Sequence, residues 1–134
     1  MVGTSPFLGA GQFGSRALEY RRRFYERPDN ITRLVEYCAE RHDVRGVQAL
    51  ADPVIARALR RVEHDLEVVA VVGLGPLRED ARTIEGMNLR AVLLHASRVD
   101  GRDPDDVLRD LNRLRDRFGV PVGIATHRPD VTLP

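Results

Sequence analysis

The chain has 134 residues, of which 43% are hydrophobic and 31% charged, a length and composition typical of one folded domain. Its formal net charge of +1 provides no basic field for a nucleic acid backbone, so we expect no nucleic acid partner. All 21 basic residues are arginine, which excludes Schiff-base chemistry on lysine and lysine-containing phosphate loops.

Apolar runs and turn residues alternate along the whole chain. In the first half we expect a strand at Pro6–Leu8, a helix from Ser15 to about Glu26, a helix after Pro28 capped by Asp29 or Asn30, a strand at Val44–Leu50 and a helix at Val54–Glu63 opened by Asp52 and Pro53. In the second half we expect a strand at Leu66–Val72, a helix at Leu77–Glu85, a strand at Leu89–Leu94, a helix from Pro104 to Phe118 capped by Asp103, and a strand at Val120–Ala125.

Two patterns support these assignments. The segments at Leu66–Val72 and Leu89–Leu94 are nearly unbroken apolar runs, which are typical of parallel strands buried on both faces. The helix after Asp103 is amphipathic, and Gly119 is its expected end. Its predicted apolar stripe consists of Val107, Leu108, Leu111, Leu114 and Phe118.

The fold class that follows is α/β, with a parallel (βα)4β sheet in a single domain over residues 1–134. The last four strands begin near residues 44, 66, 89 and 120, a spacing that fits one-helix crossovers between parallel neighbours. Two architectures have this formula: half of a TIM-barrel-like fold, and a five-stranded doubly wound open sheet. A complete barrel takes about 250 residues, so a half barrel needs a second copy or a partner chain to cover its two free edges.

Three segments support the half barrel by resemblance. Ser5–Gly14, Leu93–Ser97 and Gly123–His127 resemble segments of uncharacterised archaeal (βα)-barrel proteins. The resemblance extends over most of the chain, as the N-terminal half of that family's barrel. It implies barrel-like (βα) units and no known activity.

The setting of the protein is predicted from its single cysteine and its N-terminus. Because Cys38 is the single cysteine, the chain cannot form an intramolecular disulfide. We interpret Cys38 as a small buried apolar residue in a helix. The N-terminus does not resemble a signal peptide, and no segment approaches the about 20 apolar residues of a membrane helix. We therefore expect a cytoplasmic protein without membrane contact.

A glycine-rich segment offers one candidate cofactor site. Gly9, Gly11 and Gly14 match the GxGxxG fingerprint, in which backbone amides and a helix N-terminus hold a pyrophosphate. The preceding predicted strand is short, and the first acidic residue at a strand end is Asp52, well beyond the usual spacing. A nucleotide or dinucleotide site is therefore the alternative hypothesis, and a glycine-rich turn is the simpler interpretation.

The main candidate site lies where the predicted strands end, because loops from parallel strands converge at their carboxyl ends. His95 and His127 directly follow apolar strands, and we assign them acid/base or electrophilic roles. Asp100 and Asp52 are the expected carboxylates that orient an imidazole, and Arg128 is the expected clamp for an anion. The further expected ligand-binding residues are Gln12, Gln48 and Ser97.

The reaction itself is not predicted. No HExxH, HxH or paired CxxC spacing indicates a metal site, and no cofactor is identified. Three hypotheses remain: an enzyme or enzyme subunit for a small polar or anionic metabolite, a nucleotide-binding domain, and a non-catalytic half barrel that assembles with another chain.

Overall fold

The computed structural model describes residues 1–132, without the side chains of residues 11–13. Its strands are β1 (Val2–Gly3), β2 (Gly46–Leu50), β3 (Glu67–Val72), β4 (Leu89–Leu94) and β5 (Val122–Ile124). Its α-helices are α1 (Ala17–Tyr20), α2 (Pro28–His42), α3 (Pro53–Leu59), α4 (Leu77–Thr83), α5 (Pro104–Phe118) and α6 (Pro129–Thr132). Short 3₁₀ turns are η1 (Ser5–Leu8), η2 (Gly11–Arg16) and η4 (Ala96–Arg98), and η3 (Arg21–Tyr25) is a π-helical segment.

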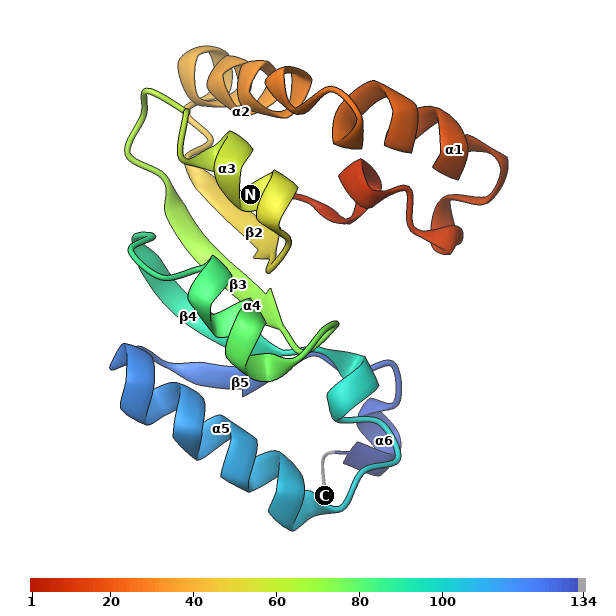
Figure 1. The fold of residues 1–134 in the computed structure, drawn as a ribbon, viewed down its shortest axis with the longest axis vertical. Coiled ribbons are helices and arrows are strands. Elements are labelled where there is room, and N and C mark those ends of the chain that lie inside the picture. Colours follow the sequence, from red (N-terminus) through yellow and green to blue (C-terminus); the bar gives the residue numbers. More distant parts are fainter. Residues whose placement is uncertain (133–134) are drawn as a thin grey trace.

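The five strands form one sheet in which every neighbouring pair is parallel, so the predicted α/β class is confirmed (Figure 1). The strand order is β1-β2-β3-β4-β5, the same as the order in the sequence. A doubly wound sheet reverses its strand order at one point and carries helices on both faces. The observed order contains no reversal, and the doubly wound alternative is therefore wrong.

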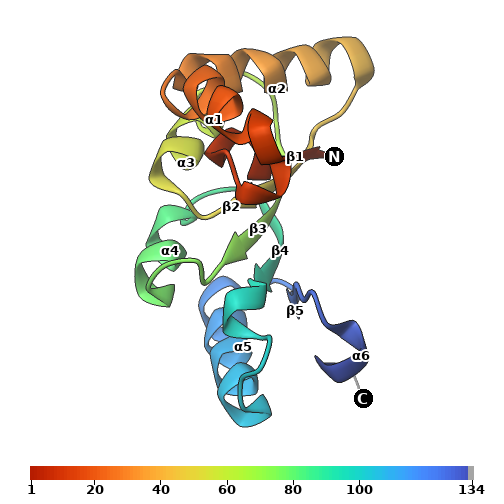
Figure 2. The same cartoon turned by 90° about the vertical axis from the view of Figure 1, so that its right-hand side faces the viewer.

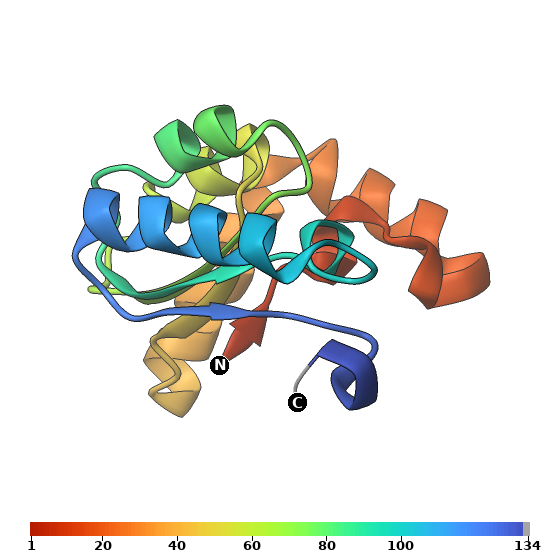
Figure 3. The ribbon, with the colours of Figure 1, turned by 90° about the horizontal axis from the view of Figure 1, so that it is seen from below.

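The crossover helices cover one face of the sheet. Helices α3, α4 and α5 lie on the same side of the strands in two perpendicular views (Figures 2 and 3). The buried core lies between them and the strand residues that point toward them, among which Ala70, Val72 and Leu94 are fully enclosed. Helix α2 extends this layer, because the hydroxyl of Thr32 donates to the carbonyl of Ala58 in α3 at 3.0 Å.

The opposite side of the sheet is covered much less, and we call it the open face. It consists of Gln48, Glu67, Val69, Val71, Ala91, Leu93 and Gly123, which alternate with the core residues along β2 to β5. None of the seven belongs to the buried core cluster, and only Val71 is itself buried. Five of the seven are apolar or glycine, and the two polar side chains, Gln48 and Glu67, are exposed.

Several predicted elements differ from the structure in the first part of the chain. Residues 6–8 lie in η1 rather than in a strand, and the first strand is instead β1. Pro28 begins α2, as proline does readily at the first position of a helix, so the predicted caps at Asp29 and Asn30 are wrong.

Two predicted side-chain positions also differ. In α5, Leu108 is 56% exposed and does not join the buried stripe. Cys38 in α2 is half-buried rather than buried.

Within the described residues, no helix has both the length and the apolar composition needed to span a membrane.

Candidate functional site

Asp100 lies in the loop between η4 and α5, and it joins the carboxyl ends of β4 and β5. Its carboxylate accepts a short hydrogen bond from the hydroxyl of Thr126 and a 3.1 Å bond from the backbone N–H of His127. Nδ1 of His127 lies 3.3 Å from the same carboxylate. The bond from Thr126, followed by those from His127, lowers the pKa of Asp100 below the usual range of a carboxyl group, although desolvation opposes the shift.

His95 directly follows β4 and is held by its own loop. The backbone N–H of Ser97 donates to Nδ1 of His95 at 3.1 Å. An Nδ1 atom that accepts a hydrogen bond carries no proton, so in the neutral ring the proton is on Nε2. Burial lowers the pKa of His95 below its usual value, the neighbouring His127 lowers it further, and Asp100 opposes both. His95 therefore presents an N–H donor to its surroundings at neutral pH.

His127 has the complementary arrangement. Because its Nδ1 faces the Asp100 carboxylate, the proton is assigned to Nδ1 and the lone pair to Nε2. The His127 side chain is 77% exposed, so Nε2 is accessible to a ligand. His95 and His127 thus form a pair in which one imidazole is arranged to donate a hydrogen and the other to accept one.

The loop after β5 also carries the predicted anion clamp. The backbone N–H of Arg128 donates to the Thr126 hydroxyl at 2.9 Å, which ties this loop to Asp100 through Thr126. Among the described residues, the Arg128 guanidinium has no hydrogen-bond or ion-pair partner. A guanidinium without a partner among the described residues, carried by the residue next to His127, is suited to bind a carboxylate or phosphate group.

A second acid, which sequence reasoning missed, organises the loop after β3. Asp80 is buried, and its carboxylate accepts the backbone N–H groups of Gly73 at 2.7 Å and of Gly75 at 3.3 Å. The carbonyl of Gly73 in turn accepts the hydroxyl of Ser97 at 3.0 Å. Asp80 therefore supports His95 indirectly, through Gly73 and Ser97. Its position in the first turn of α4, after two closely spaced glycines, is the signal that the sequence offers.

Of the remaining predicted residues, Gln48 lies in β2 and Asp52 at the start of α3, not on the loops after β4 and β5. Asp52 caps α3 by accepting from the backbone of Val54 at 2.8 Å, and it also accepts the hydroxyl of Tyr25 at 3.1 Å. Gln48 is exposed on the open face and lies within β2 rather than after it. Gln12 is one of the residues whose side chains fall outside the described part of the structure.

The glycine-rich segment lacks the setting that the dinucleotide fingerprint requires. The fingerprint connects a strand directly to the start of a helix. Here η1 separates β1 from Gly9, and the backbone within η2 leaves helical geometry at Gly14, where φ is 56°. The side-chain surroundings of Gly11 lie outside the described residues. In the described part of this segment, no observation favours a nucleotide ligand.

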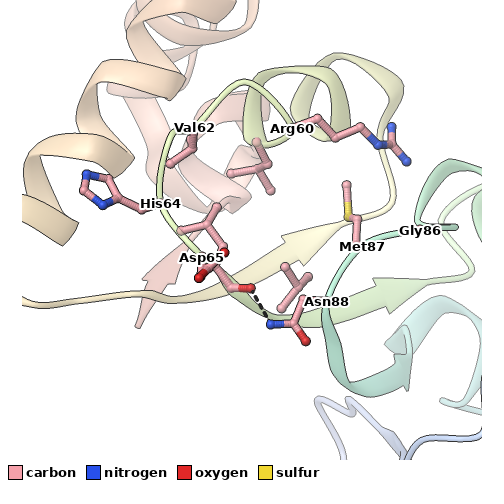
Figure 4. A pocket seen from close by; sticks show the side chains of 10 residues that line it. Arg60, Val62, His64, Asp65, Gly86, Met87 and Asn88 are labelled. Atoms are coloured by element: carbon pink, nitrogen blue, oxygen red, sulfur yellow. Dashed lines mark hydrogen bonds between the residues drawn. The ribbon is translucent and has the colours of Figure 1, made fainter.

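A pocket of about 270 Å³ lies elsewhere, at the amino ends of β3 and β4 (Figure 4). Its walls include Arg60, His64, Asp65 and Met87, and Asn88 closes one side by donating to the carbonyl of Leu66 at 3.1 Å. In parallel α/β folds, ligands and catalytic groups gather at the opposite end of the sheet, where the strands have their carboxyl ends. The pocket contains neither His95 nor His127.

In the part of the chain that the structure describes, no group of three or more His, Cys, Asp or Glu side chains is placed to hold a metal ion. Comparisons with family models, with curated proteins and with solved structures found no match. The resemblance to archaeal barrel proteins stays a prediction.

Proposed function

We propose that this chain is an acid/base enzyme, or a subunit of one, that binds a small polar or anionic metabolite at the carboxyl ends of β4 and β5. The observation that carries the proposal is the set of bonds from Asp100 to Thr126 and His127, because it joins the loop after β5 to the loop that bears His95. Side chains from two strands thereby act on one region of space.

Each residue has a role that follows from its protonation. His95, neutral and protonated on Nε2, donates a hydrogen bond to a carbonyl or hydroxyl oxygen of the ligand and polarises it. His127 accepts a proton at Nε2, and the imidazolium that results is stabilised by Asp100 beside Nδ1. Arg128 pairs with the anionic group of the ligand. The supported reaction class is proton transfer next to a carbonyl group.

The fold that supports this site is, in our proposal, half of a TIM-barrel-like structure. Three observations support it: the unreversed parallel order, the helices on one face, and the polar groups at the carboxyl ends of the strands. A half barrel assembles with a second copy or another chain, because its open face and edges are otherwise exposed to water.

Ligand binding tests the proposal even though the substrate is unidentified. Thermal melting of the purified chain is measured against a panel of phosphorylated and carboxylated sugars and keto acids. We expect one class of anion to raise the melting temperature, and Arg128→Gln and His95→Ala to abolish that rise. His42→Ala is the matched control, because His42 is exposed at the end of α2 and contacts Tyr37 rather than the site.

For any ligand that binds, proton exchange from the carbon next to its carbonyl group is then followed by NMR in D₂O. Exchange that depends on His127 supports the acid/base role. A ligand-induced rise that survives both Arg128→Gln and His95→Ala would contradict the proposed site, and so would the absence of any rise across the panel.

A further inference from the structure

The surface area of the chain is large for its mass. The exposed area is 8236 Å², for a protein of 15.1 kDa. A compact monomer of that mass exposes about 7,100 Å², so the excess is about 1,100 Å². The projecting α1 accounts for part of it (Figure 1). In a stable protein interface each partner buries about 800 Å², an area of comparable size.

In a monomer, the open face exposes apolar side chains to water. Val69, Ala91 and Leu93 are only half-buried, although they occupy the centre of the sheet. Gly123 leaves space beside them that the side chain of Leu93 partly fills, since a Cβ atom at Gly123 would lie 3.1 Å from Cδ2 of Leu93. In a closed barrel these positions point inward and are filled by side chains from the other strands.

Both edges of the sheet also carry unused backbone groups, and their positions can be assigned. In a parallel strand, alternate residues direct their N–H and C=O groups to opposite neighbours. Pro121 and Ala125 bond to β4, so the backbone groups of Val122 and Ile124 face the free edge. Thr4 donates to the carbonyl of Gln48, so the backbone groups of Gly3 face the other free edge. Among the described residues, no further strand pairs with either edge.

We infer that two copies of this chain associate through these edges, with β5 of each copy pairing in parallel with β1 of the other. A two-fold axis along the strand direction makes both pairings at once, keeps all strands parallel, and closes the two sheets into one barrel around both open faces. One chain supplies both kinds of edge, so a second copy is a sufficient partner. The inference rests on the half-barrel geometry of the proposed function and not on its chemistry.

Closure also changes the candidate site. The carboxyl ends of β5 and of the partner copy's β1 become neighbours, as parallel paired strands require. The loop that begins at Thr4 in one copy then lies beside Thr126 to Arg128 of the other. The second copy would therefore supply one wall of the site that holds His127.

The primary test measures molecular mass in solution by light scattering over a range of concentrations. We expect a species of about twice the chain mass at concentrations of about 100 μM. Ile124→Pro removes the N–H group that faces the free edge and leaves the bonds to β4 intact, so it should raise the dimer dissociation constant about tenfold or more. Ile124→Ala is the matched control, because it loses the same packing and keeps the N–H group.

A second pair of variants tests the open face. Leu93→Lys places a charge where the barrel interior would form and should also raise the dimer dissociation constant, whereas Leu108→Lys, at an exposed position of α5, should leave it unchanged. A wild-type monomer at all concentrations overturns the inference. A dimer that is weakened in Leu93→Lys but has the wild-type dissociation constant in Ile124→Pro also overturns it, because the sheets would then stack face to face without pairing at their edges.

Hydrogen exchange gives a measurement that requires no substitution. The amide groups of Gly3, Val122 and Ile124 should exchange slowly in the dimer and rapidly on dilution to monomer. Rapid exchange of all three in the dimer contradicts edge pairing. Failure of the ligand panel leaves these results unaffected, so the failure of the proposed function and the failure of this inference can be told apart.

Discussion

The carboxylate of Asp100 faces both the backbone N–H and the imidazole Nδ1 of His127, at 3.1 and 3.3 Å, although the two residues follow different strands. The pKa of Asp100 is lowered in the folded state, principally by the hydrogen bond from Thr126. A depressed carboxyl pKa contributes stability that is present above its unfolded value of 3.8 and is lost as pH falls through the lower folded value.

We therefore expect Asp100→Asn to melt at a lower temperature than the wild type at about pH 7, and the difference to shrink as the pH falls to about 2.5. Calorimetry at the two pH values checks this. Asp116→Asn is the control, because Asp116 is an exposed acid of α5 with no hydrogen-bond or ion-pair partner in the described part of the chain. Equal melting of Asp100→Asn and the wild type at neutral pH would show that this carboxylate does not hold the loop.

The direction in which the pKa of His95 changes tests whether the carboxyl ends of β4 and β5 lie close together. Its pKa is lowered by burial and by His127 and raised by Asp100. His127→Ala should therefore move the pKa of His95 up toward the ordinary value of 6.5, and Asp100→Asn should move it further down. Titration of the imidazole resonances by NMR follows both changes. Shifts of the same sign in the two variants, or no shift in either, would contradict the close approach of His95 and His127.

The same lowered pKa makes a prediction for stability. A base whose folded pKa is depressed binds protons more readily when unfolded, so its stability contribution is present above its unfolded value of 6.5 and is lost as pH falls below it. His95→Gln should therefore reduce the loss of unfolding free energy that accompanies acidification below pH 6.5. Urea unfolding at several pH values measures it, with His42→Gln as the control. A slope that is unchanged in the His95 variant would contradict the assigned shift.

Elements defined by strong local patterns can be predicted from this sequence. The strand at Leu89–Leu94 has the predicted bounds, and the helix at Pro104–Phe118 is capped by Asp103 and ended by Gly119 as expected. Apolar periodicity and cap residues are local properties, so a single sequence contains them. The prediction of a strand at residues 6–8 is wrong because these residues are apolar for another reason: Phe7 is buried in the core and packs against Phe24 at 4.9 Å between ring centroids.

The site can be predicted in outline only. The rule that function gathers at carboxyl strand ends groups His95, Asp100, His127 and Arg128, and the bonds from Asp100 to the β5 loop are consistent with that grouping. The rule places Asp52 in the same group, yet that carboxylate is occupied by the α3 cap and by Tyr25. Which polar groups satisfy one another depends on tertiary contacts, and these are not encoded in local spacing.

Asp80 illustrates the limit and provides a stability test. Its buried carboxylate pairs with two backbone N–H groups in the loop after β3, and removing it leaves both donors without a partner. We expect Asp80→Ala to lower the free energy of unfolding by about 2 kcal/mol. Glu79→Ala is a close control, since Glu79 lies in the same first turn of α4 but is exposed. If urea unfolding shows the same loss of stability in Asp80→Ala and Glu79→Ala, both substitutions act only through the dipole of α4.

Gly73 links that loop to the site, and its conformation sets a final test. Its φ is +99°, and a Cβ atom there would lie 2.8 Å from Cγ of Arg98, in the η4 segment that also holds His95 through Ser97. Gly86 has a φ of +77° with open space around it, so it carries backbone strain alone. We expect Gly86→Ala to cost about 1 kcal/mol and Gly73→Ala about 1 to 2 kcal/mol more, because only the latter must displace Arg98. Urea unfolding compares the two variants. Equal losses of unfolding free energy would show that the Arg98 side chain moves aside without an energetic penalty. If Gly73→Ala also shifts the His95 resonances while Gly86→Ala does not, the loop after β3 positions that imidazole.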